Sequence, residues 1–168
     1  MRRTIVLLTL VTALSSAARS QTKTVDNHKE SLAARRCVGA QLSVKHEADD
    51  AGVGQRDVTY SFKNKSSSPC TLSGYPSFAL LNRRGRPLRG QTTSHNSDQV
   101  TVVRLAPGGK AYFNIHYSAC GTVGTPPCPT SYQVRIKAPH DARAFTLREK
   151  LDPFQLNVSL SPVQKSAP

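Results

Sequence analysis

The side chains in this sequence best suited to chemistry are arginines gathered in one short stretch. Within LNRRGRPLRG (81–90), four of seven consecutive residues are arginines: Arg83, Arg84, Arg86 and Arg89. A guanidinium group pairs bidentately with phosphate, sulfate or carboxylate. The stretch therefore predicts a polyanion-binding turn whose partner is an anionic envelope polymer or an acidic protein. A solubilising hairpin tip that binds nothing is the alternative interpretation.

The same stretch matches a known nucleic-acid motif. Arg-Gly-Arg-Pro at 84–87 has the core of a minor-groove hook, in which an extended Arg-Gly-Arg follows A·T base edges. Here it follows a secretion signal and lies in a strand–turn–strand pattern, so we expect no nucleic-acid partner. Arg135 and Lys137 would extend the positive charge if their face adjoined this turn.

A weaker set of candidates would make the chain an enzyme accessory or a weak hydrolase. It consists of His116 and the adjacent pair Asp49 and Asp50, in an apparent turn with Gly52. Adjacent residues of an extended strand point to opposite sides, so neighbouring acids rarely form the carboxylate pair of a glycosidase. His116 falls on the polar face of a predicted strand, and no GxSxG elbow is present. We therefore expect no catalytic residues and no enzyme activity.

A metal carrier is the third class considered. Envelope copper sites generally combine histidine with methionine or cysteine, but Met1 is the only methionine and no His-x-His occurs. The sequence therefore predicts neither a metal ligand nor a cofactor.

The four cysteines predict two disulfides. An even number of cysteines behind a secretion signal is typical of a disulfide framework, and four cysteines allow three pairings. We favour Cys37–Cys70, which would tie an early strand to a later one, and Cys120–Cys128, which would close the loop 121–127. No CxxC pair supports a zinc site.

The first twenty residues have the pattern of a signal peptide. Arg2 and Arg3 precede an apolar run at 5–14, and Ala18 and Ser20 are spaced for cleavage after Ser20. The run has about half of the roughly 20 residues needed to span a bilayer, so we expect no transmembrane segment in the mature chain. The sequence thus predicts a secreted or periplasmic protein.

Length and composition fit one exported domain. The 168 residues are 38% hydrophobic and 20% charged, which argues against a disordered chain and against a polytopic membrane protein. The formal net charge is +13. Cleavage after Ser20 would remove three arginines and no acid, leaving 20 basic and 10 acidic residues and a charge of +10. Such a charge suits anionic surroundings.

The elements that must position these residues are strands. From Ala40 onward, apolar and polar residues alternate with period two between Gly- and Pro-rich turns. We expect an all-β, Ig-like antiparallel β-sandwich of about seven or eight strands at 37–160, after a flexible leader (21–36) and before a disordered tail (161–168). The alternating runs are at 42–45, 58–63, 109–118, 132–137 and 154–160.

Two motifs in this region carry a resemblance. Cys-x-Leu-x-Gly-Tyr-Pro is found at 70–76, and Leu-x-Pro-Gly-x-x-Ala at 105–111. With Cys37 and Cys128, they resemble the secreted bacterial family called domain of unknown function 4232. The resemblance implies an exported β-sandwich with no catalytic set to carry over. The sequence as a whole predicts a non-enzymatic module that acts by binding or structural association at the cell envelope.

Overall fold

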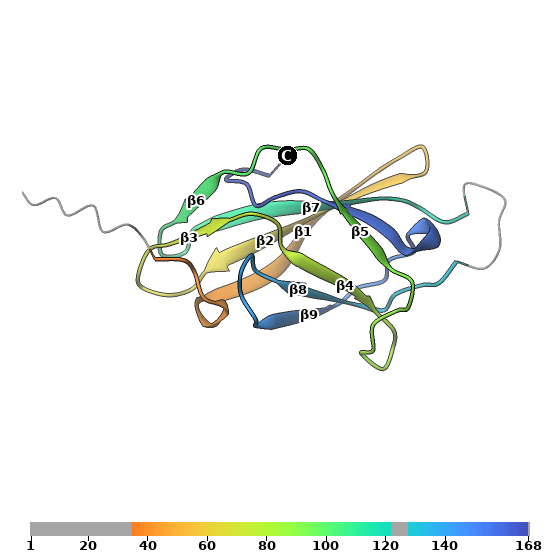
Figure 1. The fold of residues 1–168 in the computed structure, drawn as a ribbon, viewed down its shortest axis with the longest axis horizontal. Helices are drawn as coiled ribbons and strands as arrows, with labels where there is room; N and C mark the ends of the chain where they lie inside the picture. Colours follow the sequence, from red (N-terminus) through yellow and green to blue (C-terminus); the bar gives the residue numbers. More distant parts are fainter. Residues whose placement is uncertain (1–34, 122–127, 168) are drawn as a thin grey trace, which may run out of the picture. The chain divides into compact units, whose positions relative to one another are not determined.

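The computed structural model describes residues 35–121 and 128–167. The predicted signal peptide and most of the predicted leader lie outside these residues. Two short 3-10 turns, η1 (Gly39–Gln41) and η2 (Phe154–Leu156), accompany ten strands (Figure 1). The strands are β1 (Leu42–Gly52), β2 (Gln55–Asn64), β3 (Cys70–Ser73), β4 (Ser77–Leu81), β5 (Thr92–His95), β6 (Val102–Leu105), β7 (Lys110–Ser118), β8 (Gln133–Lys137), β9 (Ala144–Arg148) and β10 (Asn157–Leu160).

The strands form a sandwich-like arrangement, as expected for an all-β chain. One sheet has the order β1-β2-β7-β10-β5, and two smaller sheets have the orders β3-β6 and β4-β8-β9 (Figure 1). Neighbouring strands are antiparallel except β10 and β5, which pair in parallel. All four residues of β5 are exposed. A strand without a buried face has no alternating pattern, so no feature of the sequence indicated β5.

Alternation explains the core, most plainly in β7. Ala111, Phe113, Ile115 and Tyr117 are buried, whereas the residues between them are half-buried or exposed. The ring centroids of Tyr60 and Phe62 lie 5.4 and 5.3 Å from that of Phe113. Removing a large apolar side chain from water contributes about 1.5–3 kcal/mol, so this aromatic cluster is a major source of stability.

The smaller sheets close the same core. Leu80, Val134 and Ile136 from β4 and β8 are fully buried, and Leu72 and Leu105 are nearly so. Together with the five-stranded sheet they form one contiguous cluster. No helix among the described residues is long and apolar enough to cross a membrane.

Both predicted disulfides are present, Cys37–Cys70 and Cys120–Cys128. The first lies in the core, since Cys37 is 4% exposed and Cys70 is 1% exposed. Disulfides of this kind form in oxidising compartments, consistent with an extracellular or periplasmic domain.

Two chain segments differ from the sequence prediction. Residues 154–156 are not a strand but η2, where Gln155 and Leu156 have φ of +52° and +58°. Residues 161–164, predicted as a disordered tail, are part of the fold. Val163 is completely buried, and the backbones of Tyr112 and Gln164 exchange hydrogen bonds of 2.8 and 2.7 Å. The segment has only four residues and contains Pro162, so no alternation of apolar and polar residues is visible in it.

A β-bulge interrupts β1. His46 pairs with Tyr60 and Ala48 with Thr59, so Glu47 is the extra residue. Its Oε1 accepts hydrogen bonds from Ser61 Oγ and Lys110 Nζ, both at 2.6 Å. The hydrogen bond from Lys110 is the main reason that the pKa of Glu47 is lowered. This carboxylate therefore anchors the bulge to β2 and β7.

We predict that Glu47→Ala lowers the free energy of unfolding by about 1–2 kcal/mol, because it leaves the fully buried Ser61 hydroxyl without its acceptor. Lys45 is the matched control. It contacts the same carboxylate at 3.7 Å but is 73% exposed, so Lys45→Ala should change stability by less than about 0.5 kcal/mol. Urea unfolding measures both values. Equal losses in the two variants would show that the contacts of Glu47 at the bulge contribute no more to stability than the exposed contact of Lys45.

Candidate functional site

The arginine-rich stretch forms a tight turn between β4 and β5. The backbone N–H of Asn82 donates to Arg86 O at 2.9 Å, and that of Gly85 donates to Asn82 O at 3.0 Å. Asn82 Oδ1 also accepts from the backbone N–H of Arg84 (2.8 Å) and Arg86 (3.1 Å). Gly85 has φ +72°, a conformation that favours glycine. Arg84–Arg86 are thus held in a turn, not in the extended form of a minor-groove hook.

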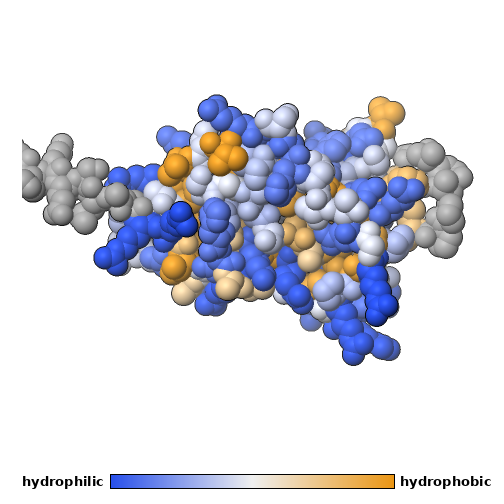
Figure 2. Space-filling view, viewed as in Figure 1, coloured by the Kyte–Doolittle hydropathy of each residue, from blue (hydrophilic) through white to orange (hydrophobic). Residues whose placement is uncertain are grey.

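The arginine side chains of this turn point outward. The Arg83 guanidinium carbon lies 4.3 Å from the Tyr132 ring centroid, and Arg83 Nη2 donates to Tyr132 Oη at 3.1 Å. Within the described part of the chain, no arginine of the turn forms an ion pair. Figure 2 shows a strongly hydrophilic projection at the end of the molecule where β4 ends. The exposed residues are Arg83, Arg84, Arg86 and Arg89.

The three-stranded sheet adds further positive charge next to the turn. Arg135 Nη2 donates to Gly85 O at 3.2 Å. Arg148 pairs in register with Gln133, which pairs with Leu81 at the start of the turn. Lys137 lies at the other end of β8, opposite Ser77. The predicted extension of the charge therefore applies to Arg135 and not to Lys137, and Arg148 was missed.

We call these six residues the basic surface: Arg83, Arg84, Arg86, Arg89, Arg135 and Arg148. The outer face of the sheet beside the turn has no acid among its register positions, which are Ser77, Ala79, Gln133, Arg135, Lys137, Ala144, Thr146 and Arg148. Like charges repel one another in a folded protein, so a group of them that no acid neutralises favours an anionic ligand.

The candidates for an enzyme do not come together. Asp49 and Asp50 lie within β1, not in the turn, and point to opposite sides. Asp50 pairs with Asp57, and Asp57 with His116, so these three form one row on the outer face of the large sheet. His116 Nδ1 lies 3.0 Å from Asp57 Oδ1, and both side chains are about half exposed. Asp49 is on the other face.

A polar cavity of about 530 Å³ surrounds His116. The side chains that line it largely satisfy one another: Asp98 Oδ2, for example, accepts hydrogen bonds from Asn96 Nδ2 (2.7 Å) and Gln164 Nε2 (3.0 Å). This pairing is typical of a hydrated outer sheet face. The lining residues are Asp57, Asn96, Asp98, Asn114, His116, Ser159, Ser161 and Gln164.

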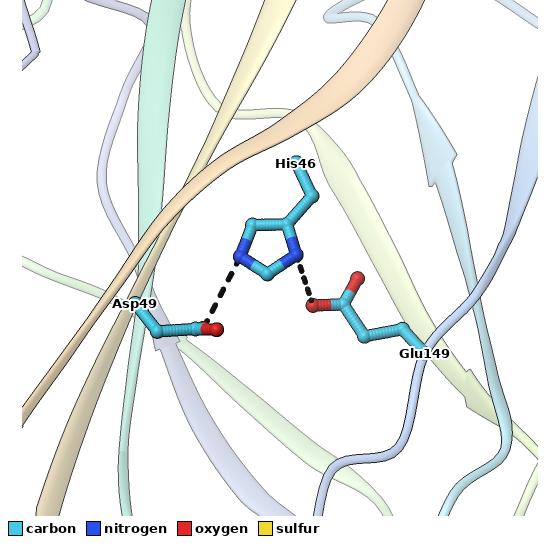
Figure 3. Close-up of side chains that lie close together, drawn as sticks. All are labelled: His46, Asp49 and Glu149. Carbon is cyan, nitrogen blue, oxygen red and sulfur yellow. Dashed lines mark ion pairs between the residues drawn. The ribbon is translucent and has the colours of Figure 1, made fainter.

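The structure also brings together three residues that the sequence analysis did not connect. His46 Nε2 lies 3.2 Å from Asp49 Oδ1, and His46 Nδ1 lies 3.1 Å from Glu149 Oε1 (Figure 3). Residues three apart in a regular strand face opposite ways. Because of the bulge at Glu47, His46 and Asp49 lie on the same face of β1. His46 pairs with Tyr60 of β2, and Asp49 pairs with Val58.

Glu149 is the unusual member of this cluster. Its side chain is 9% exposed, and its carboxylate is paired with the His46 ring and lies beside the buried Tyr60 hydroxyl. Burial raises the pKa of Glu149, and the neighbouring Tyr60 and His46 oppose that rise. Burial, followed by the influence of Glu149, also raises the pKa of Tyr60. The cluster thus places two carboxylates, those of Asp49 and Glu149, on a single imidazole ring that can carry at most one positive charge.

Comparisons with known proteins identify a family. A family model described as "Domain of unknown function (DUF4232)" matches residues 37–164. No curated protein is similar enough to count as a match. Among solved structures, a β-glucosidase from Kluyveromyces marxianus is 12% identical, with a TM-score of 0.31 over 70% of this chain. The match spans 15% of that enzyme and carries no argument about function.

Proposed function

Since the chain belongs to the family described as domain of unknown function DUF4232, its role must be argued from its own surface, and we propose that it is an exported, non-enzymatic module that binds an anionic envelope polymer through the basic surface. Export rests on the signal-peptide pattern at 1–20 and on the two disulfides. The mature protein would act in the periplasm or outside the cell.

The observation that carries the proposal is a hydrogen-bonded turn that presents guanidinium groups without an ion pair to any described residue. Binding is weakened when a flexible loop must first be ordered. Here the hydrogen bonds of Asn82 and the positive φ of Gly85 fix the backbone before any ligand arrives. The contact of Arg135 with Gly85 O holds a fifth guanidinium beside the turn. Binding therefore costs little for ordering the backbone of the turn.

The distribution of charge favours a polymer over a small anion. An exposed ion pair contributes about 0–1 kcal/mol, so a single phosphate or sulfate would be held weakly. A chain of repeated anionic groups can engage several arginines at once, and the contacts then act together. Phosphate, sulfate and carboxylate groups all match a guanidinium. Such binding must weaken as salt screens the charges.

The test is retention of the mature chain, 21–168, on immobilised polyphosphate across a salt series, beside a variant in which the four turn arginines become serine. We expect the wild type to be retained at low salt and released steeply as salt rises. The variant should elute near the void at salt concentrations that still retain the wild type.

A control variant separates a local site from net charge. It has the same change of four charges at exposed positions outside the basic surface, namely Lys63→Ser, Lys65→Ser, Arg104→Ser and Lys165→Ser. We expect it to elute close to the wild type. If the two quadruple variants elute together, the basic surface is not a site. If the wild type is barely retained at low salt, the polymer proposal fails, and an acidic protein becomes the partner to search for.

A further inference from the structure

The cluster of His46, Asp49 and Glu149 sets two carboxylates against one histidine ring, so the acids outnumber the base. A carboxylate only accepts hydrogen bonds. Glu149 is nine-tenths buried, and its carboxylate faces the His46 ring, with Nδ1 3.1 Å from Oε1, and the buried Tyr60 hydroxyl. A buried charge is costly unless it is paired or bound to a metal. The histidine that pairs with Glu149 has its other ring nitrogen facing a second carboxylate, that of Asp49 (Figure 3).

We propose that this cluster is a site for a divalent transition-metal ion, with Zn²⁺ as the reference ion. His46 Nδ1 and the Glu149 carboxylate bind the ion, and Nε2–H of the same ring donates to Asp49. Water completes the coordination. The inference is independent of the basic surface, because it concerns other residues and a ligand that is a cation, not an anion.

The spacing of the atoms supports this assignment. Zinc binds imidazole nitrogen and carboxylate oxygen at about 2.0–2.2 Å, which places two such ligands roughly 3.3 Å apart in a tetrahedral site. Nδ1 and Glu149 Oε1 are 3.1 Å apart. One ligand atom from each of the three residues lies within 4.8 Å of the others. Little movement is therefore needed to admit an ion.

The position of Asp49 fits a carboxylate that orients the histidine and does not itself bind the ion. A histidine that binds a metal usually donates its second ring N–H to a carboxylate, which fixes the ring and its tautomer. Asp49 Oδ1 is 3.2 Å from Nε2 and lies on the more exposed side of the ring, with 56% of its side chain in solvent. His46 is 35% exposed, which leaves room for water to reach the ion.

The chemistry of the ligands selects the ion. Imidazole favours zinc and copper, whereas Mg²⁺ and Ca²⁺ prefer oxygen ligands alone. An ion here would join the edge strand β1 of the large sheet to residues 148–150 at the end of β9. It would therefore link two sheets whose strands β1 and β9 lie close together without pairing.

The experiment is isothermal titration of untagged mature protein with ZnCl₂ at pH 7.5. We expect one saturable site per chain. His46→Gln and Glu149→Gln should each weaken binding more than a hundredfold, because each removes a ligand. Asp49→Asn should weaken it about 10–100-fold, the usual effect of losing a supporting carboxylate. Zinc should also raise the melting temperature of the wild type, since ligands that bind the native state stabilise it.

Two controls keep the test specific. His116→Gln removes a histidine in a similar pair with Asp57, but that pair is half exposed and hydrogen-bonded, so affinity should not change. His28→Gln tests the histidine in the N-terminal segment and should also leave affinity unchanged. Circular dichroism checks the fold, and His46→Gln, at a partly exposed site, carries the test if Glu149→Gln unfolds.

The proposal is overturned if the wild type shows no saturable zinc binding up to millimolar metal. It is equally overturned if folded His46→Gln protein binds zinc as tightly as the wild type. In either case the three residues form only a structural link between the sheets.

Discussion

Joint replacement of Cys37 and Cys70 by serine is expected to lower the free energy of unfolding by about 4 kcal/mol, because the chain-entropy model assigns this amount to a cross-link between residues 33 apart. The disulfide also lies in the core, so the loss includes buried contacts of both sulfurs. Urea unfolding under non-reducing conditions measures the difference. Domains of this size have only about 5–15 kcal/mol of stability in total, so the loss should be a large share of it.

The second disulfide provides the internal comparison. Cys120 and Cys128 are 8 residues apart, and the same model gives about 2.5 kcal/mol for the shorter loop. Both residues are half-buried rather than in the core. Their double serine variant should therefore be the more stable of the two. The reverse order would mean that the first disulfide does not hold the core together.

Replacement of Asn64 by alanine is the second large effect, with an expected loss of about 3 kcal/mol from several buried hydrogen bonds. Asn64 is completely buried at the end of β2. Its Nδ2 donates to Ser68 O (2.8 Å) and Leu105 O (3.2 Å), and its Oδ1 accepts from the backbone N–H of Ser66 (3.0 Å). One side chain thus ties the turn before Cys70 to the turn after Leu105.

Asn82 is the matched control for Asn64. Its Oδ1 also accepts two backbone N–H groups of a turn, but that turn is open to solvent. Water can replace these bonds, so Asn82→Ala should cost about 1 kcal/mol or less. Thermal and urea unfolding of the two variants give the comparison. A loss in Asn64→Ala no greater than that in Asn82→Ala would contradict the role given to burial.

The fold was predictable where a run of alternating residues is long enough to stand out, and not in the four-residue strands β3 and β6, although each has one buried face. β2, β7 and β8 alternate clearly, because their inward side chains must be apolar and their outward ones need not be. The exposed strand β5 and the buried segment around Val163 escaped prediction for opposite reasons: one has no apolar face, and the other has only one apolar side chain inside a proline-flanked segment.

The sites were predictable only where they are local in sequence. The four turn arginines lie within seven residues of one another, so the sequence alone revealed them. The approach of Arg135 to the turn depends on the pairing of β4 with β8. The cluster around His46 needed two facts that no pattern shows. These are a bulge that brings Asp49 to the same face as His46, and the burial of Glu149 directly after the exposed Arg148.

The central claim is that the basic surface is the binding site, and an NMR titration tests it most directly. Isotopically labelled mature protein would be titrated with inorganic polyphosphate, and amide and arginine side-chain shifts followed. We predict saturable shifts concentrated at residues 82–89 and at Arg135 and Arg148. Shifts centred on basic residues elsewhere, such as Lys63 and Lys65, or shifts spread evenly over the surface without saturation, would contradict the claim.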